Sequence, residues 1–297
     1  MKIRVSSGTA SYLSLQDSKI LEDPTTAYLL VPGKKCRGAC RYCPQGKGDS
    51  RWLSRVSWPL FESEIVSKTI KDSDLDRICL QSPDIDGYEE KIRSIVGQLE
   101  EIGKPISISS PPLPDTVLED IKGPVDHIGV GIDAVTNDIR KKTKPNYPPL
   151  LFWDYLGRAI DIFGGHNVIA HLIVGMGEDL EQLGATVKRT FDIGAKVSLF
   201  PLLLKDHEVD MYYYRKAQLL TYLIGKGNDL IESLEIVQKR PYECIDEIED
   251  GEIFRTRGCP GCNRPFYTTK PGKEHKNYPR KLNLQEINQV KKELGIL

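Results

Sequence analysis

Two kinds of segment alternate along most of this 297-residue chain: short apolar runs of strand length, and longer segments with helical periodicity. The apolar runs predict six strands, over 26–31, 77–81, 105–109, 127–133, 168–174 and 196–203. The segments between and after them predict helices over 59–71, 88–102, 115–121, 150–163, 180–191 and 211–224. Strands joined in this way run parallel, with right-handed crossovers. The pattern therefore predicts an α/β fold in which six βα units form a partial, open (β/α)6 barrel.

The alternation ends near residue 229 and divides the chain into three parts. Residues 1–25 form an N-terminal segment, residues 26–228 the barrel, and residues 229–297 a cysteine-containing C-terminal extension rich in turn residues. We expect the extension to pack across the mouth of the barrel. Ile287, Val290 and Leu294 have helical spacing within it and predict a short helix over 284–294.

Composition and charge exclude several classes of protein. Hydrophobic residues make up 39% of the chain and charged residues 28%, which is typical of a globular protein. The sequence shows no apolar run of membrane-spanning length and no secretory leader, which predicts a cytoplasmic protein without a membrane partner. A formal net charge of -1 gives no basis for binding nucleic acid.

Five of the seven cysteines fall into two tight groups, which favours metal or redox chemistry over disulfides. The first group is Cys36, Cys40 and Cys43, directly after the first predicted strand, where barrel enzymes carry their catalytic loops. Three thiolates can hold three irons of a 4Fe-4S cluster and leave the fourth iron open. A zinc knuckle is the alternative, but no fourth cysteine or histidine lies nearby in the sequence.

The second group is Cys259 and Cys262, on a Cys-Pro-Gly-Cys turn of a kind used by both zinc and iron-sulfur sites. Cys244, earlier in the extension, offers a third thiolate. We expect these three cysteines to hold an auxiliary 4Fe-4S cluster, with structural zinc as the alternative. Cys79, on the second predicted strand, is expected to be a buried apolar thiol, and His171 a core histidine.

The segment from Cys36 to Cys43 resembles the cluster-binding motif of the radical S-adenosylmethionine (SAM) superfamily, and the resemblance covers residues 26–228. The run Cys-Arg-Tyr-Cys-Pro-Gln from Cys40 resembles the biotin synthase and lipoyl synthase branch. Residues 258–267 and 277–280 resemble a subunit of the archaeal-type two-component lipoyl synthase. The resemblance implies a partial barrel of the radical SAM type, with a 4Fe-4S cluster on Cys36, Cys40 and Cys43 that binds SAM.

The same resemblance implies residues that contact SAM. Tyr42 precedes the third cysteine and would lie near the adenine. Asp133 matches the position that bonds the ribose hydroxyls in related enzymes, although it would equally suit a cap of the following turn. Val174 and Gly175 match the adenine-contacting motif, and Glu178 belongs either to that motif or to the start of the next helix. The Gly-Gly-Glu motif that many members carry is not evident.

The function implied is a radical SAM sulfurtransferase, a lipoyl synthase subunit that inserts sulfur into an octanoyl chain on a lipoyl carrier protein. Leu172, Phe200 and the leucines after Pro201 would line an apolar channel for that chain. The alternatives are a biotin synthase-like or other radical SAM enzyme with an auxiliary cluster, and a non-catalytic iron-sulfur or zinc scaffold. Because the third and fifth predicted strands contain no cysteine, true biotin synthase is disfavoured.

The resemblance also implies a sister radical SAM subunit and a small acidic electron donor such as a ferredoxin. Basic residues cluster around the first cysteine group, with Asp49 the one acid among them. They suit docking of an acidic donor or carrier domain, or balance the negative charge of the cluster. These residues are Lys34, Lys35, Arg37, Arg41, Lys47, Arg51 and Arg55.

Overall fold

The computed structural model describes residues 1–204 and 207–297. Its centre is an eight-stranded sheet of order β10-β9-β8-β7-β6-β2-β1-β5. Six neighbouring strands are parallel, and they are the six that the sequence predicts: β2 (Thr26–Leu30), β6 (Arg77–Gln81), β7 (Ile106–Ser110), β8 (Val125–Asp133), β9 (Val168–Val174) and β10 (Lys196–Pro201). Because β10 and β5 form its two edges, the sheet is not closed, and the prediction of an open α/β barrel is confirmed.

Residues near the N-terminus extend this sheet beyond β2. β1 (Lys2–Val5) pairs antiparallel with β2, and β5 (Leu60–Glu62) pairs antiparallel with β1. Between β1 and β2 lies α1 (Ser7–Tyr12), whose first turn is capped by the Ser6 side chain. The sequence pattern predicted neither β1 nor β5. β5 takes the first residues of the predicted helix 59–71, so α2 begins only at Ser63 and ends at Lys71.

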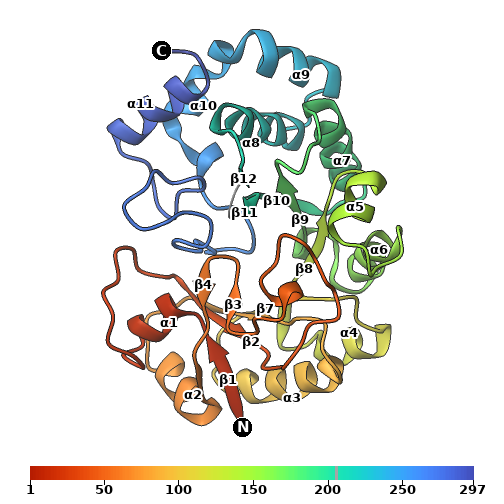
Figure 1. The fold of residues 1–297 in the computed structure, drawn as a ribbon, viewed down its shortest axis with the longest axis vertical. Coiled ribbons are helices and arrows are strands. Elements are labelled where there is room, and N and C mark those ends of the chain that lie inside the picture. The colour runs from red at the N-terminus through yellow and green to blue at the C-terminus, as the bar shows by residue number, and fades with distance from the viewer. Residues whose placement is uncertain (205–206) are drawn as a thin grey trace.

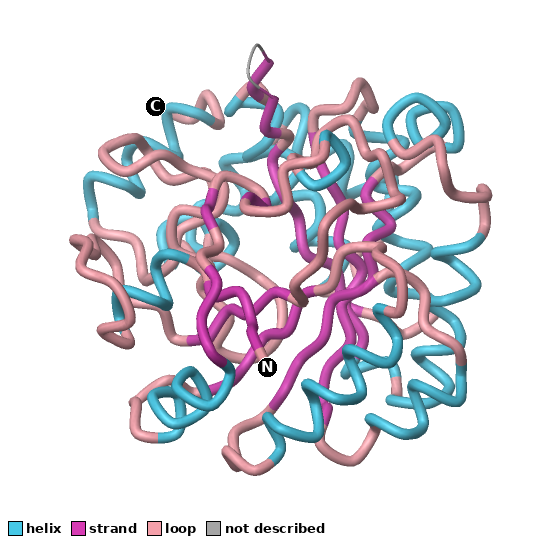
Figure 2. Tube along the Cα trace, turned by 60° about the horizontal axis from the view of Figure 1, so that its bottom comes forward, coloured by secondary structure: helices cyan, strands magenta, loops and turns pink. Residues whose placement is uncertain are grey.

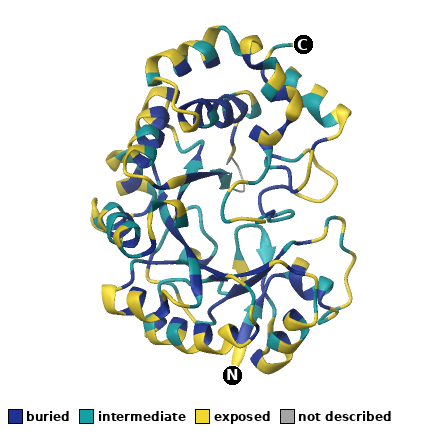
Figure 3. Ribbon diagram, turned by 180° about the vertical axis from the view of Figure 1, so that it is seen from behind, coloured by how far each residue is buried: buried dark blue, intermediate teal, exposed yellow. Residues whose placement is uncertain are grey.

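Helices cover the outer face of the parallel sheet, as Figure 2 shows. In α3 (Tyr88–Glu100) the apolar stripe Ile92, Ile95, Val96 and Leu99 is buried, which is the packing that its periodicity predicts. The other outer helices also bury one face and expose the other (Figure 3). They are α4 (Asp115–Ile121), α6 (Leu151–Phe163) and α7 (Leu180–Asp192), with a further helix α5 (Asn137–Thr143) after β8, whereas α8 (Met211–Gly225) is buried on nearly all sides.

The C-terminal extension folds around α8 (Figure 1). It contains α9 (Leu230–Lys239), α10 (Ile245–Asp250) and α11 (Leu284–Glu293), with short 3-10 turns at Pro241–Cys244 and Glu252–Phe254. Arg215 of α8 is fully buried and donates to the carbonyl oxygens of His275 and Lys276 and to Glu293 of α11, at 2.7–2.8 Å. Through this one side chain, the loop that carries His275 and Lys276 and the last helix are both bonded to α8.

Two small hairpins flank the inner face of the sheet. They are β3 (Trp52–Leu53) with β4 (Val56–Ser57), and β11 (Leu203–Leu204) with β12 (His207–Glu208). Within residues 1–204 and 207–297, no helix combines the length and apolar character needed to cross a bilayer.

Candidate functional site

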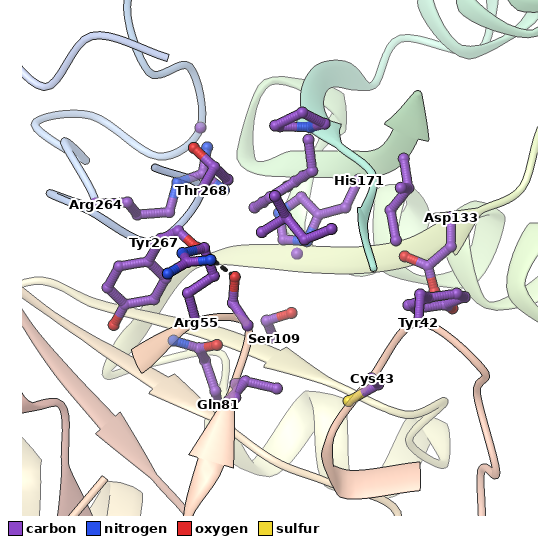
Figure 4. A pocket seen from close by; sticks show the side chains of 18 of the residues that line it. Tyr42, Cys43, Arg55, Gln81, Ser109, Asp133, His171, Arg264, Tyr267 and Thr268 are labelled. Atoms are coloured by element: carbon purple, nitrogen blue, oxygen red, sulfur yellow. Dashed lines mark hydrogen bonds between the residues drawn. The ribbon is translucent and has the colours of Figure 1, made fainter. Parts of the chain in front are cut away.

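A cavity of about 560 Å³ lies on the inner face of the parallel sheet. Its walls come from the first cysteine loop, the two hairpins, strands β6 to β10 and the extension at residues 258–268. Small-molecule sites commonly have volumes in this range. In Figure 4, Tyr42 and Asp133 lie on one side, Arg264 and Tyr267 on the other, and His171 between them. The cavity therefore joins the neighbourhoods of the two cysteine groups.

Cys36, Cys40 and Cys43 lie on the loop that follows β2, and this loop is tightly closed. A side chain at Gly46 would come within 2.6 Å of the Cys40 backbone, so only glycine lets the following turn pack against the loop. The Gly38 backbone N–H donates to Cys36 Sγ at 3.4 Å, and backbone N–H groups of the following turn donate to Cys43 Sγ. The loop thus holds three sulfur atoms and supplies donors to two of them.

These thiols have the chemistry of cluster ligands. Burial raises the pKa of Cys40 to about 12 and also raises the pKa of Cys43, so the free thiols stay protonated at neutral pH. Iron binds the thiolate and supplies the positive charge that stabilises it, while backbone donors share the charge on sulfur. No three His, Cys, Asp or Glu side chains of the described residues are grouped as ligands of one metal ion. A cluster does not require such grouping, because its thiolates bind different irons.

Asp133 ends β8 and is held from two directions. The Tyr42 hydroxyl donates to its Oδ2 at 2.5 Å, and Lys144 Nζ donates to the same oxygen at 2.8 Å and to the Gly131 carbonyl oxygen at 2.6 Å. Lys144 also lies over the Phe152 ring, 3.3 Å from its centroid. Tyr42, Cys43 and Asp133 all line the cavity, so the structure brings these residues together beside the first cysteine loop.

Val174 and Gly175 lie at the end of β9 and are not among the cavity-lining residues. Val174 is fully buried in the core, and Gly175 has a φ of 103°. The Glu178 carboxylate accepts hydrogen bonds from the backbone N–H groups of Gly175 and Met176, at 2.6 and 2.9 Å. Asp179 caps α7, so Glu178 holds the loop after β9 rather than starting the helix.

The second cysteine group lies on the opposite side of the cavity. Cys259 and Cys262 both line it, and so does Cys79 from β6. Cys244 does not: it is buried at the start of α10, where Glu243 and Glu247 are the charges that act on it and burial raises its pKa to about 11. The structure thus places Cys79 beside the turn and leaves Cys244 in a separate environment.

Comparison with known proteins identifies the family. The model of the radical SAM superfamily matches residues 30–190, which is more than half of the chain. The chain belongs to the radical SAM superfamily. Membership implies a 4Fe-4S cluster and SAM, in agreement with the donor set on the first cysteine loop. The lipoyl synthase branch stays a prediction.

Two solved structures align with this chain, and the first of them shares its fold. Methylornithine synthase (PylB) aligns with a TM-score of 0.51 and 14% identity, over 62% of this chain and 55% of that one, so the match spans little more than half of that enzyme. TYW1 with a lysine-pyruvate adduct bound aligns with a TM-score of 0.45 and 10% identity, over 72% and 80%. The search of curated proteins gives no match.

Several cavity residues of this radical SAM protein were missed from the sequence. Ser107, Ser109 and His171 line the cavity because they lie at alternate, inward-facing positions of their strands. The alternation in Ile-Ser-Ile-Ser of β7 is the signal that predicts the two serines. Arg264 adjoins the Cys-Pro-Gly-Cys turn but had no signal of its own.

The residues expected to line an apolar channel line the cavity, with one correction. Phe200 and the leucines at 202–204 line the cavity, whereas Leu172 is fully buried in the core and does not. The alternation along β9 explains the difference, because it turns His171 and Ile173 inward and Leu172 outward.

His171 occupies space that a glycine provides. A side chain at Gly129 would come within 2.7 Å of the imidazole Cε1 atom. The ring packs edge-on against Phe200, with 5.2 Å between centroids. Burial, and to a lesser extent the positive charge of Arg264, lowers the pKa of His171 to about 3. The imidazole is therefore neutral at physiological pH and offers the cavity one donor and one acceptor.

Proposed function

We propose that this radical SAM protein is a sulfurtransferase of the lipoyl synthase type, which inserts sulfur into an octanoyl chain on a lipoyl carrier protein. The observation that carries the proposal is the shared cavity, with Tyr42, Cys43 and Asp133 on one side and Cys259 and Cys262 on the other. When bound, SAM and the reduced cluster supply a radical that removes a hydrogen atom from an unactivated carbon. A sulfur donor on the second cysteine group would face the same substrate.

The requirements of this reaction agree with the lining of the cavity. Each new C–S bond would consume one SAM and one electron and would release methionine and 5'-deoxyadenosine, and the iron of the sulfur donor would take up the electron left over when the bond forms. A carbon radical must meet the sulfur atom before it meets water or another hydrogen donor. Apolar side chains provide walls that fit an alkyl chain and exclude water: Leu53, Ile173, Phe200, Leu202 and Leu203.

Partners belong to this proposal. Among the basic residues near the first cysteine group, Arg37 pairs with Asp84 and Arg51 with Asp49, whereas others extend into solvent. Lys34, Lys35, Arg41 and Lys47 are exposed and make no ion pair with the described residues, and they suit an acidic carrier domain or an acidic electron donor such as a ferredoxin. A sister radical SAM subunit would take part in the same sulfur insertion.

A second candidate is favoured by the polar inner face of the sheet. Gln81, Ser107, Ser109 and His171 line the cavity and offer hydrogen bonds to a polar substrate. In that case the protein carries out a different radical modification, and the second cysteine group relays electrons or anchors the substrate.

The test uses anaerobically reconstituted protein with SAM, a chemical reductant and an octanoyl-lysine peptide, with and without the sister subunit. Reconstitution with a heavy isotope of sulfide labels the sulfur atoms held by the protein. We expect 5'-deoxyadenosine together with a peptide that contains heavy sulfur. Deoxyadenosine without a thiolated peptide would exclude sulfur insertion and leave the second candidate, and no SAM cleavage would exclude both.

A further inference from the structure

Three side chains form a row on the inner face of the sheet, directly beneath the Cys-Pro-Gly-Cys turn. Tyr28 of β2 is in register with Cys79 of β6, and Cys79 is in register with Ser107 of β7. All three line the cavity, so they point to the same side of the sheet. Adjacent strands lie about 4.8 Å apart, which makes Cys79 the middle member of the row.

The two thiols of the turn contact the two ends of this row. Cys262 Sγ lies 3.6 Å from the Tyr28 hydroxyl. The Ser107 hydroxyl donates to the Ile78 carbonyl oxygen at 3.2 Å, and it lies close enough to the thiols of Cys259 and Cys79 to offset part of the rise in pKa that burial causes in both. Because Cys79 lies between the residues that contact Cys262 and Cys259, its thiol faces the space between the two turn thiols.

The position of the turn over the row is fixed by bonds to the start of β2. The Asn263 side chain donates to the Asp23 carbonyl oxygen at 2.8 Å and accepts from the Thr25 backbone N–H at 3.1 Å. The Arg264 backbone N–H donates to the Tyr28 hydroxyl at 2.7 Å. The turn is therefore held independently of any bound group.

A positive charge accompanies the three thiols. The Arg264 guanidinium lies 4.1 Å from the Phe200 ring centroid and donates to Ser198 Oγ at 2.9 Å. Burial raises the pKa of both Cys79 and Cys259, and the charge of Arg264 partly offsets that rise. Cys244 lies apart from this positive charge, and its charged neighbours are Glu243 and Glu247, which add to the rise in its pKa that burial causes.

We infer that Cys79, Cys259 and Cys262 are the protein ligands of a second iron-sulfur cluster, and that Cys244 is not a ligand. With three thiolates, one iron of a cubane has no cysteine ligand and faces the cavity. Residues far apart in the sequence would hold it: one on a barrel strand and two on the extension. The presence of a cluster at this site rests on the proposed function, whereas the choice of its ligands rests on the contacts described above.

The experiment measures metal content without substrate, so its outcome is separate from that of the sulfur-insertion assay. The starting protein carries Cys36→Ala, Cys40→Ala and Cys43→Ala, so iron bound after anaerobic reconstitution reports the second site alone. We expect about four irons and four sulfides per chain, with the visible absorption of a cluster. Cys79→Ala added to this protein should remove most of the iron, and the matched control Cys244→Ala should leave it unchanged.

Three results would overturn the inference. They are retention of about four irons in Cys79→Ala, loss of iron in Cys244→Ala, or one zinc ion and no sulfide in the starting protein. Circular dichroism checks folding of each variant. If Cys79→Ala does not fold, Cys79→Ser replaces it, because serine keeps the size of the side chain. A serine ligand must alter the electron paramagnetic resonance spectrum of the reduced cluster. An unaltered spectrum in Cys79→Ser would count against Cys79 as a ligand.

Discussion

At the scale of single residues, the carboxylate of Asp133 is held beside the first cysteine loop by Tyr42 and Lys144. Asp133→Asn removes the negative charge that would accept hydrogen bonds from the SAM ribose, and such bonds contribute about 1.5–3 kcal/mol. We expect SAM to bind roughly tenfold to a hundredfold more weakly, with the iron content unchanged, in equilibrium dialysis of reconstituted protein. Asp138→Asn, an exposed neighbour on α5, is the control. Equal SAM affinity of the two variants would show that Asp133 does not contact SAM.

His171 gives this protein a specific pH dependence of stability. Its pKa is about 3 in the folded protein, because burial disfavours the charged imidazole, and about 6.5 in the unfolded chain. Above pH 6.5 the imidazole is neutral in both states and has no effect. Below it, the unfolded chain binds a proton that the folded protein does not, so the free energy of unfolding falls by up to about 1.4 kcal/mol per pH unit.

The matched comparison for this effect is His171→Asn, which is polar and does not titrate. Urea denaturation at intervals from about pH 7.5 to about pH 5.5 should show wild type losing stability relative to the variant only below the pKa of the free imidazole. Carboxylates common to both proteins cancel in the difference. Parallel stability curves over this range would mean that His171 is protonated in the folded protein as readily as in the unfolded chain.

At the scale of elements, the C-terminal extension depends on one buried ion pair. Arg215 has no exposed side-chain surface, and its partner Glu293 is 9% exposed. Arg215→Met leaves the glutamate buried without a cation, and we expect a loss of about 3–5 kcal/mol in the free energy of unfolding by guanidinium. In the double variant with Glu293→Met, the loss should be smaller than the sum of the two single losses. Additive losses would show that the pair is not coupled.

Elements with a periodic pattern could be predicted from the sequence, and elements defined by a distant partner could not. The six parallel strands show as apolar runs because both of their faces are buried. β1 and β5 are short, and they form strands only because β1 pairs with β2 and β5 pairs with β1. The same distinction applies to the site. Cys36, Cys40 and Cys43 were evident from spacing, whereas the place of Cys79 beside Cys262 depends on how the extension folds back onto β6.

At the scale of the whole molecule, the proposed function predicts that a carrier domain docks on the exposed basic residues near the first cysteine loop. The variant to test combines Lys34→Glu, Lys35→Glu and Arg41→Glu. Its control reverses three exposed lysines on the outer helices, Lys68, Lys71 and Lys91, so the net charge changes equally. Electrostatic complementarity acts mainly on association and weakens with salt. We expect the KM for an octanoylated carrier to rise roughly tenfold in the first variant and to lose its dependence on ionic strength.

Two further measurements make this prediction specific to carrier docking. A chemical reductant removes any contribution from an acidic electron donor, and a short octanoyl-lysine peptide removes the carrier surface while keeping the reacting chain. The KM for the peptide should be the same in wild type and in both variants, because the cavity walls are unchanged. A raised KM for the peptide would place the effect in the cavity. An unchanged KM for the carrier would exclude this face as its docking surface, since a partner of opposite charge must lose attraction when three positive charges are reversed.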